Sequence, residues 1–137
     1  MTQVSADGPC PCGRLDARGR PLPFARCCGP CLADFAQRAA PDAESLMRSR
    51  YCAFVLQDAD YLMTTWYWSK RPPGVQFEPG TRWLGLEVRA HRVIDADHAE
   101  VEFVARSRRA GRGERLHERS RFVREDGRWY YVDGDVA

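Results

Sequence analysis

Apolar and polar residues alternate along the stretch Trp83-Leu84-Gly85-Leu86-Glu87-Val88-Arg89-Ala90-His91-Arg92-Val93. A period of two is typical of a β-strand with one buried face, and here that face would carry Leu84, Leu86, Val88 and Ala90. Residues 99–108, 115–124 and 128–132 alternate in the same way, and short polar or Gly-containing segments separate them. Such segments are typical of hairpins. The second half of the chain therefore predicts a four-stranded antiparallel meander.

The region before these strands has the period of a helix. Between Ala43 and Gln57 the apolar residues recur every three or four positions, which predicts one buried stripe: Leu46, Met47, Tyr51, Phe54 and Val55. Asp42 and Asp58 are placed to cap this helix and a second one that runs to about Trp66. A short helix is also expected over residues 32–40. Helices followed by strands predict an α+β domain with the helices on one face of a curved sheet.

Length and composition limit the classes of protein to which this chain can belong. The chain has 137 residues, 44% of them hydrophobic, which suits one domain with its own core. The net charge of +2 gives no reason to expect a polyanionic partner. Residues 1–9 are polar and lack the charged-then-apolar pattern of a secretory signal. No apolar run approaches the roughly 20 residues that span a bilayer. We therefore expect a cytoplasmic protein that does not act at a membrane.

Cysteines gather near the N-terminus, in Cys10-Pro11-Cys12-Gly13 and Cys27-Cys28-Gly29, with Cys31 close behind. The prolines and glycines among them exclude a long helix or strand. Thiols stay reduced in the cytoplasm, which favours a metal over disulfides. Thiolates at these separations can close a tetrahedron around Zn²⁺ almost without a core. The sequence thus predicts a small zinc-binding knuckle over residues 10–31, preceded by a disordered segment over residues 1–9.

The chain resembles two known patterns. Its cysteine-rich start resembles the SEC-C motif, the zinc-binding motif also found at the C-terminal end of SecA preprotein translocases. The remainder resembles the YchJ family of small bacterial proteins. That resemblance lies in four stretches: Ala43-Glu44-Ser45-Leu46-Met47-Arg48-Ser49-Arg50-Tyr51, Tyr61-Leu62 with Thr65-Trp66, Leu116-His117-Glu118-Arg119-Ser120-Arg121-Phe122, and Trp129-Tyr130-Tyr131-Val132-Asp133-Gly134. It implies a fold similar to nuclear transport factor 2 (NTF2), a cone of helices and curved sheet, over residues 32–137. It also implies zinc at the cysteines, and it supplies no activity.

The ligand set has one leading assignment and one alternative. Cys10, Cys12, Cys27 and Cys28 are the expected zinc ligands, and four thiolates leave no open position, so the site is expected to be structural. The chain departs from the usual motif by a longer connection between Cys12 and Cys27 and by the additional Cys31. Cys31 could therefore replace Cys27 or Cys28. Cys52 lies on an apolar helix and is expected to be a buried, inert thiol.

Glu118 is the one candidate for acid–base chemistry, and it shares a strand face with Leu116, Ser120 and Phe122. A carboxylate among apolar neighbours could act as a general base. The expected arrangement is instead an ion pair with Arg48 or Arg50, because buried charges are usually paired. A pocket in the cone would draw its polar groups from these residues.

Aromatic residues could line the mouth of that pocket or fill the core between helix and sheet, and the sequence leaves both open. They are Tyr61, Trp66, Trp83, Trp129 and Tyr130. The arginine-rich stretch over residues 106–115 is expected to be a solvated hairpin without nucleic-acid contacts. We expect a zinc-binding, non-enzymatic binding or adaptor protein, with a protein partner at the zinc module and a small ligand in the cone. The alternative is a small hydrolase or isomerase that uses Glu118 as general base.

Overall fold

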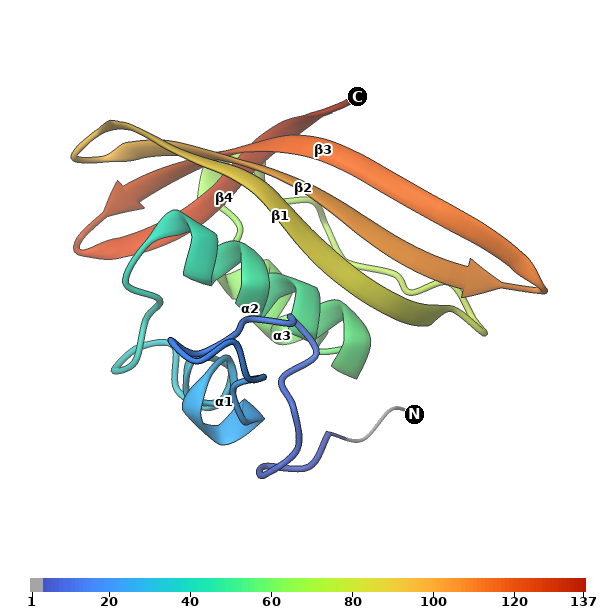
Figure 1. Cartoon of the computed structure of the whole chain (residues 1–137). Coiled ribbons are helices and arrows are strands. Elements are labelled where there is room, and N and C mark those ends of the chain that lie inside the picture. The colour runs from blue at the N-terminus through green and yellow to red at the C-terminus, as the bar shows by residue number, and fades with distance from the viewer. Residues whose placement is uncertain (1–3) are drawn as a thin grey trace.

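A four-stranded antiparallel sheet forms one layer of the fold, and the helices lie against one of its faces (Figure 1). The computed structural model describes residues 4–137. The strands follow one another in the order β1-β2-β3-β4: β1 Arg82–Asp95, β2 His98–Arg109, β3 Arg112–Glu125 and β4 Arg128–Val136. The predicted meander and the α+β class are therefore confirmed.

Two of the hairpins turn at dipeptides that can adopt positive φ. Ala110-Gly111 has φ values of 52° and 77°, and Asp126-Gly127 has values of 52° and 78°. Positive φ at both central residues matches the right-handed twist of the flanking strands, and Gly adopts it without a steric penalty. These turns set the register of β2 with β3 and of β3 with β4.

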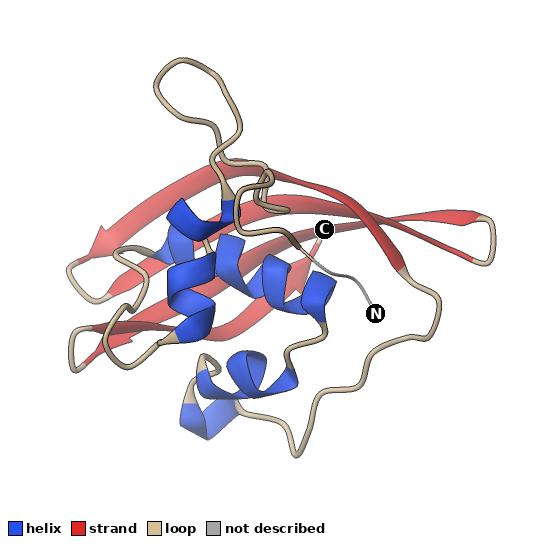
Figure 2. Cartoon of the chain, turned by 90° about the horizontal axis from the view of Figure 1, so that it is seen from below, coloured by secondary structure: helices blue, strands red, loops and turns tan. Residues whose placement is uncertain are grey.

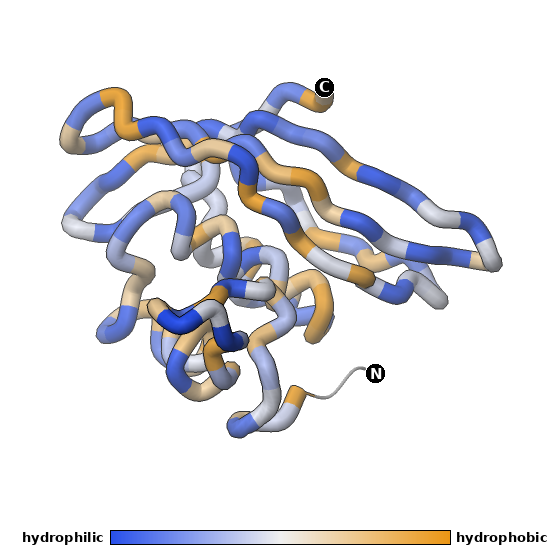
Figure 3. Tube along the Cα trace, viewed as in Figure 1, coloured by the Kyte–Doolittle hydropathy of each residue, from blue (hydrophilic) through white to orange (hydrophobic). Residues whose placement is uncertain are grey.

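The first residues of β1 depart from the simple alternation of buried and exposed side chains. Hydrophobic and hydrophilic residues alternate along parts of β1 and β2 (Figure 3), but the pairing of β1 with β2 shifts between Trp83 and Gly85. Leu84 is 52% exposed as a result, and Trp83 points inward to contact Tyr51 edge to face, with ring centroids 5.6 Å apart. The prediction that Leu84 shares the buried face with Leu86 was therefore wrong, because a bulge reverses the two faces.

Helix α2 (Ala43–Leu56) crosses the inner face of the sheet, with α3 (Ala59–Thr64) beside it (Figures 1 and 2). Each begins at its predicted cap: Asp42 accepts a hydrogen bond from the Ser45 amide at 2.7 Å and Asp58 from the Tyr61 amide at 3.0 Å. The core between α2 and the sheet is fully buried, as its central members show: Leu46, Cys52, Val101 and Phe122. Both predicted long helices are confirmed.

The helix expected over residues 32–40 was wrong. Helix α1 instead spans Gly29–Ala33, after a 3₁₀ turn at Phe24–Arg26, and a second 3₁₀ turn lies at Trp68–Lys70. Pro30 in the first turn suits a helix start. At the other end, the Asp34 carboxylate accepts a hydrogen bond from the Gln37 amide at 3.3 Å, which closes a turn in place of a further helical turn. Among the described residues, no helix has the length and apolarity needed to cross a membrane.

The N-terminal segment packs on the side of α2 that faces away from the sheet (Figure 1). The disorder predicted for residues 1–9 is not found from Ala6 onward, because the Ala6 and Gly8 carbonyls each accept a hydrogen bond at 2.9 Å, from the amides of Ala25 and Phe24. Residues 1–3 lie outside the described residues. The predicted division at residue 31 falls inside α1, so this helix joins the cysteine-rich knuckle to the rest of the chain.

Candidate metal centre and interior cavity

Two short loops bring four cysteines together. The first loop turns at Cys10–Gly13, where the Gly13 amide donates to the Cys10 carbonyl at 3.1 Å and Gly13 has a φ of 77°. The second turns at Cys27, whose amide donates to the Phe24 carbonyl at 3.1 Å. A hydrogen bond of 2.9 Å from the Cys10 amide to the Leu22 carbonyl holds the loops side by side. Backbone hydrogen bonds therefore place the thiols before any metal is considered.

The sulfur atoms of Cys10, Cys12, Cys27 and Cys28 all lie within 4.8 Å of one another. The Cys12 and Cys27 sulfurs are 3.6 Å apart and those of Cys27 and Cys28 are 4.0 Å apart. A zinc tetrahedron with Zn–S bonds of about 2.3 Å places its sulfurs about 3.8 Å apart. All four cysteines are free thiols in this structure. Their spacing fits a tetrahedral metal ion.

The thiols also perturb each other's ionisation. Hydrogen bonds from Cys10 and then Cys27 lower the pKa of the Cys12 thiol, because they stabilise its thiolate. Hydrogen bonding to Cys10 and Cys12 in turn raises the pKa of Cys27. Four thiolates this close cannot all carry charge unless a cation neutralises them. The donor set therefore suits a soft divalent cation.

Two further cysteines lie near the centre. Cys31 is not part of the group of four sulfurs. Cys52, on α2, is fully buried, and its sulfur is 3.5 Å from that of Cys10. The sequence predicts the burial of Cys52, but its contact with the cluster was missed because 42 residues separate the two cysteines. Their meeting depends on the packing of the knuckle against α2, which no local pattern indicates.

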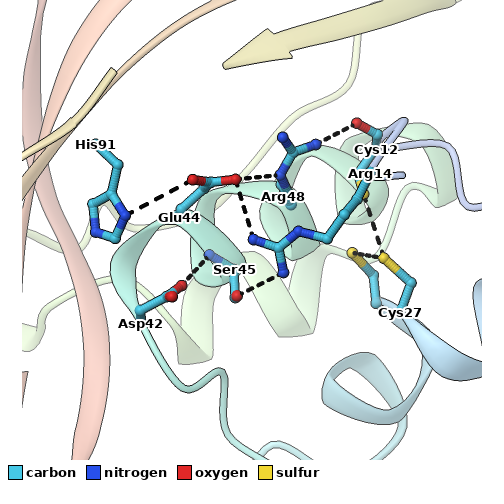
Figure 4. A network of polar contacts seen from close by, with 9 residues as sticks. Cys12, Arg14, Cys27, Asp42, Glu44, Ser45, Arg48 and His91 are labelled. Carbon is cyan, nitrogen blue, oxygen red and sulfur yellow. Dashed lines mark hydrogen bonds and ion pairs between the residues drawn. The ribbon is translucent and has the colours of Figure 1, made fainter. Parts of the chain in front are cut away.

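An ion-pair network joins the knuckle to α2 (Figure 4). Arg48 donates to the Cys12 carbonyl at 2.9 Å through Nη1 and to Glu44 at 2.9 Å through Nε. Arg14 donates to Glu44 at 3.1 Å and to the Ser45 hydroxyl at 3.0 Å. Burial raises the pKa of Glu44, but hydrogen bonds from Arg48 and Arg14 outweigh it and hold that pKa below its ordinary value. The network places two arginines beside the thiol cluster.

A second feature is a cavity of about 230 Å³ between α2 and the sheet. Three of the predicted pocket residues, Arg50, Trp66 and Glu118, lie on its wall. The other lining residues are mostly apolar: Met47, Phe54, Phe103, Leu116, Ser120 and Tyr131. The sequence pattern that points to Ser120 and Tyr131 as cavity residues is the alternation of the strands. Ser120 lies two positions after Glu118, so the two share a face of β3, and β3 pairs with β4, which carries Tyr131. The cavity has few polar groups, as ligand sites usually do.

The remaining predicted pocket residues lie elsewhere. Arg48 belongs to the network at the knuckle. Trp83 lines a separate hollow of about 160 Å³ with Phe77 and Glu114. Tyr61 is buried and bonds to the Ser49 hydroxyl at 2.6 Å, and Trp129 is buried beneath the Arg124 guanidinium, 6.0 Å from its ring centroid. These aromatic residues mainly fill the core.

Arg50 is 4% exposed and carries the buried positive charge of the cavity. Its Nη1 donates to the Leu62 carbonyl at 2.9 Å and to the Thr65 hydroxyl at 2.6 Å. Its Cζ lies 5.1 Å from the Trp66 ring centroid and 4.6 Å from that of Tyr131, so the guanidinium makes cation–π contacts with two aromatic rings. Burial lowers the pKa of Arg50 to about 10, which leaves it charged at neutral pH.

Glu118 does not form the ion pair predicted for it. Its Oε2 accepts hydrogen bonds from the Ser120 hydroxyl and, at 3.2 Å, from the Tyr131 hydroxyl. Among the described residues no arginine lies within ion-pair distance of it, since Arg48 is held by Glu44 and Arg50 by Leu62 and Thr65. The prediction failed because both arginines are held by other acceptors and because two hydroxyl groups bond to one oxygen of the carboxylate.

The family model described as "YchJ, middle NTF2-like domain" matches residues 42–134. The chain belongs to the YchJ family. A UPF0225 protein of Polaromonas sp. strain JS666 is 69% identical over 128 residues, covering 93% of this chain and 92% of that protein. A UPF0225 protein of Methylibium petroleiphilum is 56% identical over 129 residues, covering 93% and 88%.

Two solved structures share the fold of this YchJ protein. A SEC-C motif containing protein from Rhodopseudomonas palustris superimposes with a TM-score of 0.78 at 34% identity, covering 95% of this chain and 99% of that one. Another from Psychrobacter arcticus gives a TM-score of 0.78 at 31% identity, covering 96% and 84%. The sequence resemblance to the YchJ family and its NTF2-like fold is thus confirmed, and the cysteines that could hold a metal lie in the N-terminal knuckle, before the NTF2-like domain.

Proposed function

We propose that this chain is a cytoplasmic, non-enzymatic binding protein with a structural zinc ion in its knuckle and a ligand site in its NTF2-like domain. The observation that carries the zinc assignment is the grouping of four cysteine sulfurs within 4.8 Å. Thiolates favour zinc among the common divalent ions that keep a closed tetrahedron without redox chemistry. A reducing compartment keeps the thiols available for it.

The packing of the knuckle supports a structural role for the metal. Within residues 4–39, the buried hydrophobic side chains are Cys10, Cys12 and Cys28, which are themselves members of the cluster. A segment with so little apolar core needs another source of stability, and metal binding can supply it. Four thiolates also fill the coordination sphere, so the ion has no position for a substrate.

Metal content tests this role directly. Protein purified without added metal should contain one zinc per chain, and a chelator should remove it only when the knuckle opens. A Cys12→Ser variant should lose zinc, whereas Cys31→Ser should retain it. Absence of zinc in the unmodified protein, or full retention in Cys12→Ser, would refute the assignment.

The knuckle also offers a binding surface for a protein partner. It lies on the side of α2 away from the sheet (Figure 1), and Leu15 on it is 56% exposed. A photo-crosslinking residue at position 15 should capture a defined protein in cells, and one at position 93, on β1 and outside the knuckle, should not. Equal crosslinking patterns at the two positions would argue against a partner site on the knuckle.

Glu118 supports a second candidate, a small hydrolase or isomerase. It is the only carboxylate among the described residues that line the cavity, and its Oε1 has no hydrogen-bond partner among them. The same lining contains no histidine or cysteine to form a dyad with it, which favours binding over catalysis. Hydrolysis of p-nitrophenyl acetate that disappears in Glu118→Gln would support the enzyme; equal rates in both proteins would exclude Glu118 as the base of such a reaction.

A further inference from the structure

We propose that the cavity between α2 and the sheet binds a small zwitterion of the amino-acid class with an apolar side chain. Its carboxylate would pair with Arg50 and its ammonium group with Glu118. This inference rests on the proposed role of the NTF2-like domain as a ligand site, and it names the chemistry of the ligand. The argument depends on the two charges, on their separation and on the cavity walls.

Arg50 has N–H donors that are available to a ligand. A guanidinium carries five N–H donors, and the two on Nη1 bond to Leu62 and Thr65. The donors on Nε and Nη2 have no partner among the described residues. Both acceptors of Nη1 are neutral, and among the described residues no carboxylate forms an ion pair with Arg50. Because Arg50 borders the cavity, a carboxylate there can form a charge-assisted pair with it.

Glu118 offers the complementary group on the same wall. Its Oε2 is occupied by the hydroxyls of Ser120 and Tyr131, which leaves Oε1 to accept from a ligand. The Arg50 guanidinium stacks on the ring of the same Tyr131 whose hydroxyl donates to Glu118. Tyr131 therefore contacts both charged groups, Arg50 through its ring and Glu118 through its hydroxyl.

The pair of separated charges selects the ligand. A simple carboxylate that approached Arg50 would also meet the negative charge of Glu118, and a simple amine at Glu118 would meet the positive charge of Arg50. A molecule with both groups satisfies both side chains and leaves the cavity electrically neutral. Electrostatic complementarity of this kind governs specificity more than raw affinity.

The remaining lining residues and the cavity volume determine the size and the apolar character of the ligand. Met47, Phe103 and Leu116 supply apolar surface. The volume of about 230 Å³ lies below the ~300–1,000 Å³ typical of drug-sized sites. A single amino acid with a hydrophobic side chain suits both features. Leu116 is 39% exposed, so it lies where the cavity reaches solvent and a ligand can enter.

Calorimetric titration of the full, zinc-loaded chain at pH 7 tests the inference with three probes that share one ring: L-phenylalanine, 3-phenylpropionate and phenethylamine. We expect phenylalanine to bind at least tenfold more tightly than either monofunctional analogue. Glu118→Gln should reduce its affinity at least tenfold, because the ammonium group loses its charge partner. The matched control is Glu87→Gln, an exposed glutamate on β1 outside the cavity lining, which should not change it.

Each outcome separates the inference from the proposed function. If either analogue binds as tightly as phenylalanine, or if Glu118→Gln binds phenylalanine unchanged, the zwitterion is refuted while the cavity remains a ligand site. If none of the three probes binds, the zwitterion is refuted, whereas the ligand site is refuted only if ligands of other classes also fail to bind. Glu118→Gln is preferred to an Arg50 variant because Arg50 also bonds to the backbone of α3 at the Leu62 carbonyl, and its loss could unfold the chain.

Discussion

Arg48 and Cys12 are joined by a 2.9 Å hydrogen bond from the Arg48 guanidinium to the Cys12 carbonyl, across 36 residues of sequence. This bond ties the turn that carries two cluster thiols to α2, the helix that also lines the interior cavity. The knuckle and the NTF2-like domain are therefore physically coupled, and a change at their junction is expected to affect the metal centre.

The first prediction concerns that junction. Arg48→Ala removes the bond to Cys12 and the ion pair with Glu44, and it leaves Glu44 with Arg14 at 3.1 Å and the His91 ring at 3.8 Å. We expect a loss of about 1–3 kcal/mol in the free energy of unfolding and weaker zinc retention, because a buried carbonyl loses its donor. Arg89→Ala, which breaks an exposed pair with Glu87, should cost at most about 1 kcal/mol. Chemical denaturation with zinc release measures both, and equal losses would show that Arg48 has no special role.

The second prediction separates the two cysteines that compete for the ligand set. Cys27→Ser should lower zinc affinity by orders of magnitude, because Cys27 lies 3.6 Å from Cys12 within the cluster. Cys31→Ser should keep one zinc per chain, since Cys31 lies outside that group. Competition with a chromogenic chelator gives the affinities. The reverse ranking would assign the fourth ligand to Cys31.

The third prediction uses the contact between β4 and Glu118. An added Cβ at Gly134 would lie 2.6 Å from the Glu118 carboxyl carbon, so Gly134→Ala must displace that side chain. We expect phenylalanine binding to fall at least tenfold and stability to fall by about 1–3 kcal/mol. Gly74→Ala is the control, because nothing lies within 4 Å of the added atom. Unchanged binding in Gly134→Ala would mean that the position of Glu118 does not matter to the cavity.

The fourth prediction concerns removal of the metal. Chelation should raise amide hydrogen exchange over residues 6–33, where the cluster replaces an apolar core, and should leave the central strands protected. Cys10, Cys12 and Cys28 border the core of these strands, but the residues at its centre, Leu46, Val101 and Phe122, belong to α2 and the strands. Hydrogen–deuterium exchange followed by mass spectrometry resolves the two regions. Loss of protection throughout the sheet would instead make the metal a requirement for the whole fold.

Most of the fold could be predicted from local patterns in the sequence. The alternation of β1 to β4 and the caps Asp42 and Asp58 depend on neighbours a few residues away, so they could be predicted. Leu84 was assigned to the wrong face because one bulge reverses a period of two. The short helix was misplaced because the Asp34 side chain competes for a backbone amide.

The candidate sites were harder to predict because their geometry depends on tertiary packing. The spacing of the cysteines along the sequence was enough to predict which four of them cluster. The contact of Cys52 with Cys10 joins segments 42 residues apart. The expected ion pair of Glu118 was wrong because the choice between an arginine and two hydroxyls rests on where Tyr131 lies. That position follows from a short parallel bridge between Trp66 and Tyr131, which no sequence period indicates.

X-ray absorption at the zinc edge, on protein purified without added metal, tests the central claim most directly. We predict one zinc per chain, surrounded by four sulfur atoms at about 2.3 Å, with no lighter ligand. A first shell that contains nitrogen or oxygen, or a zinc content well below one per chain, would contradict a closed four-cysteine centre.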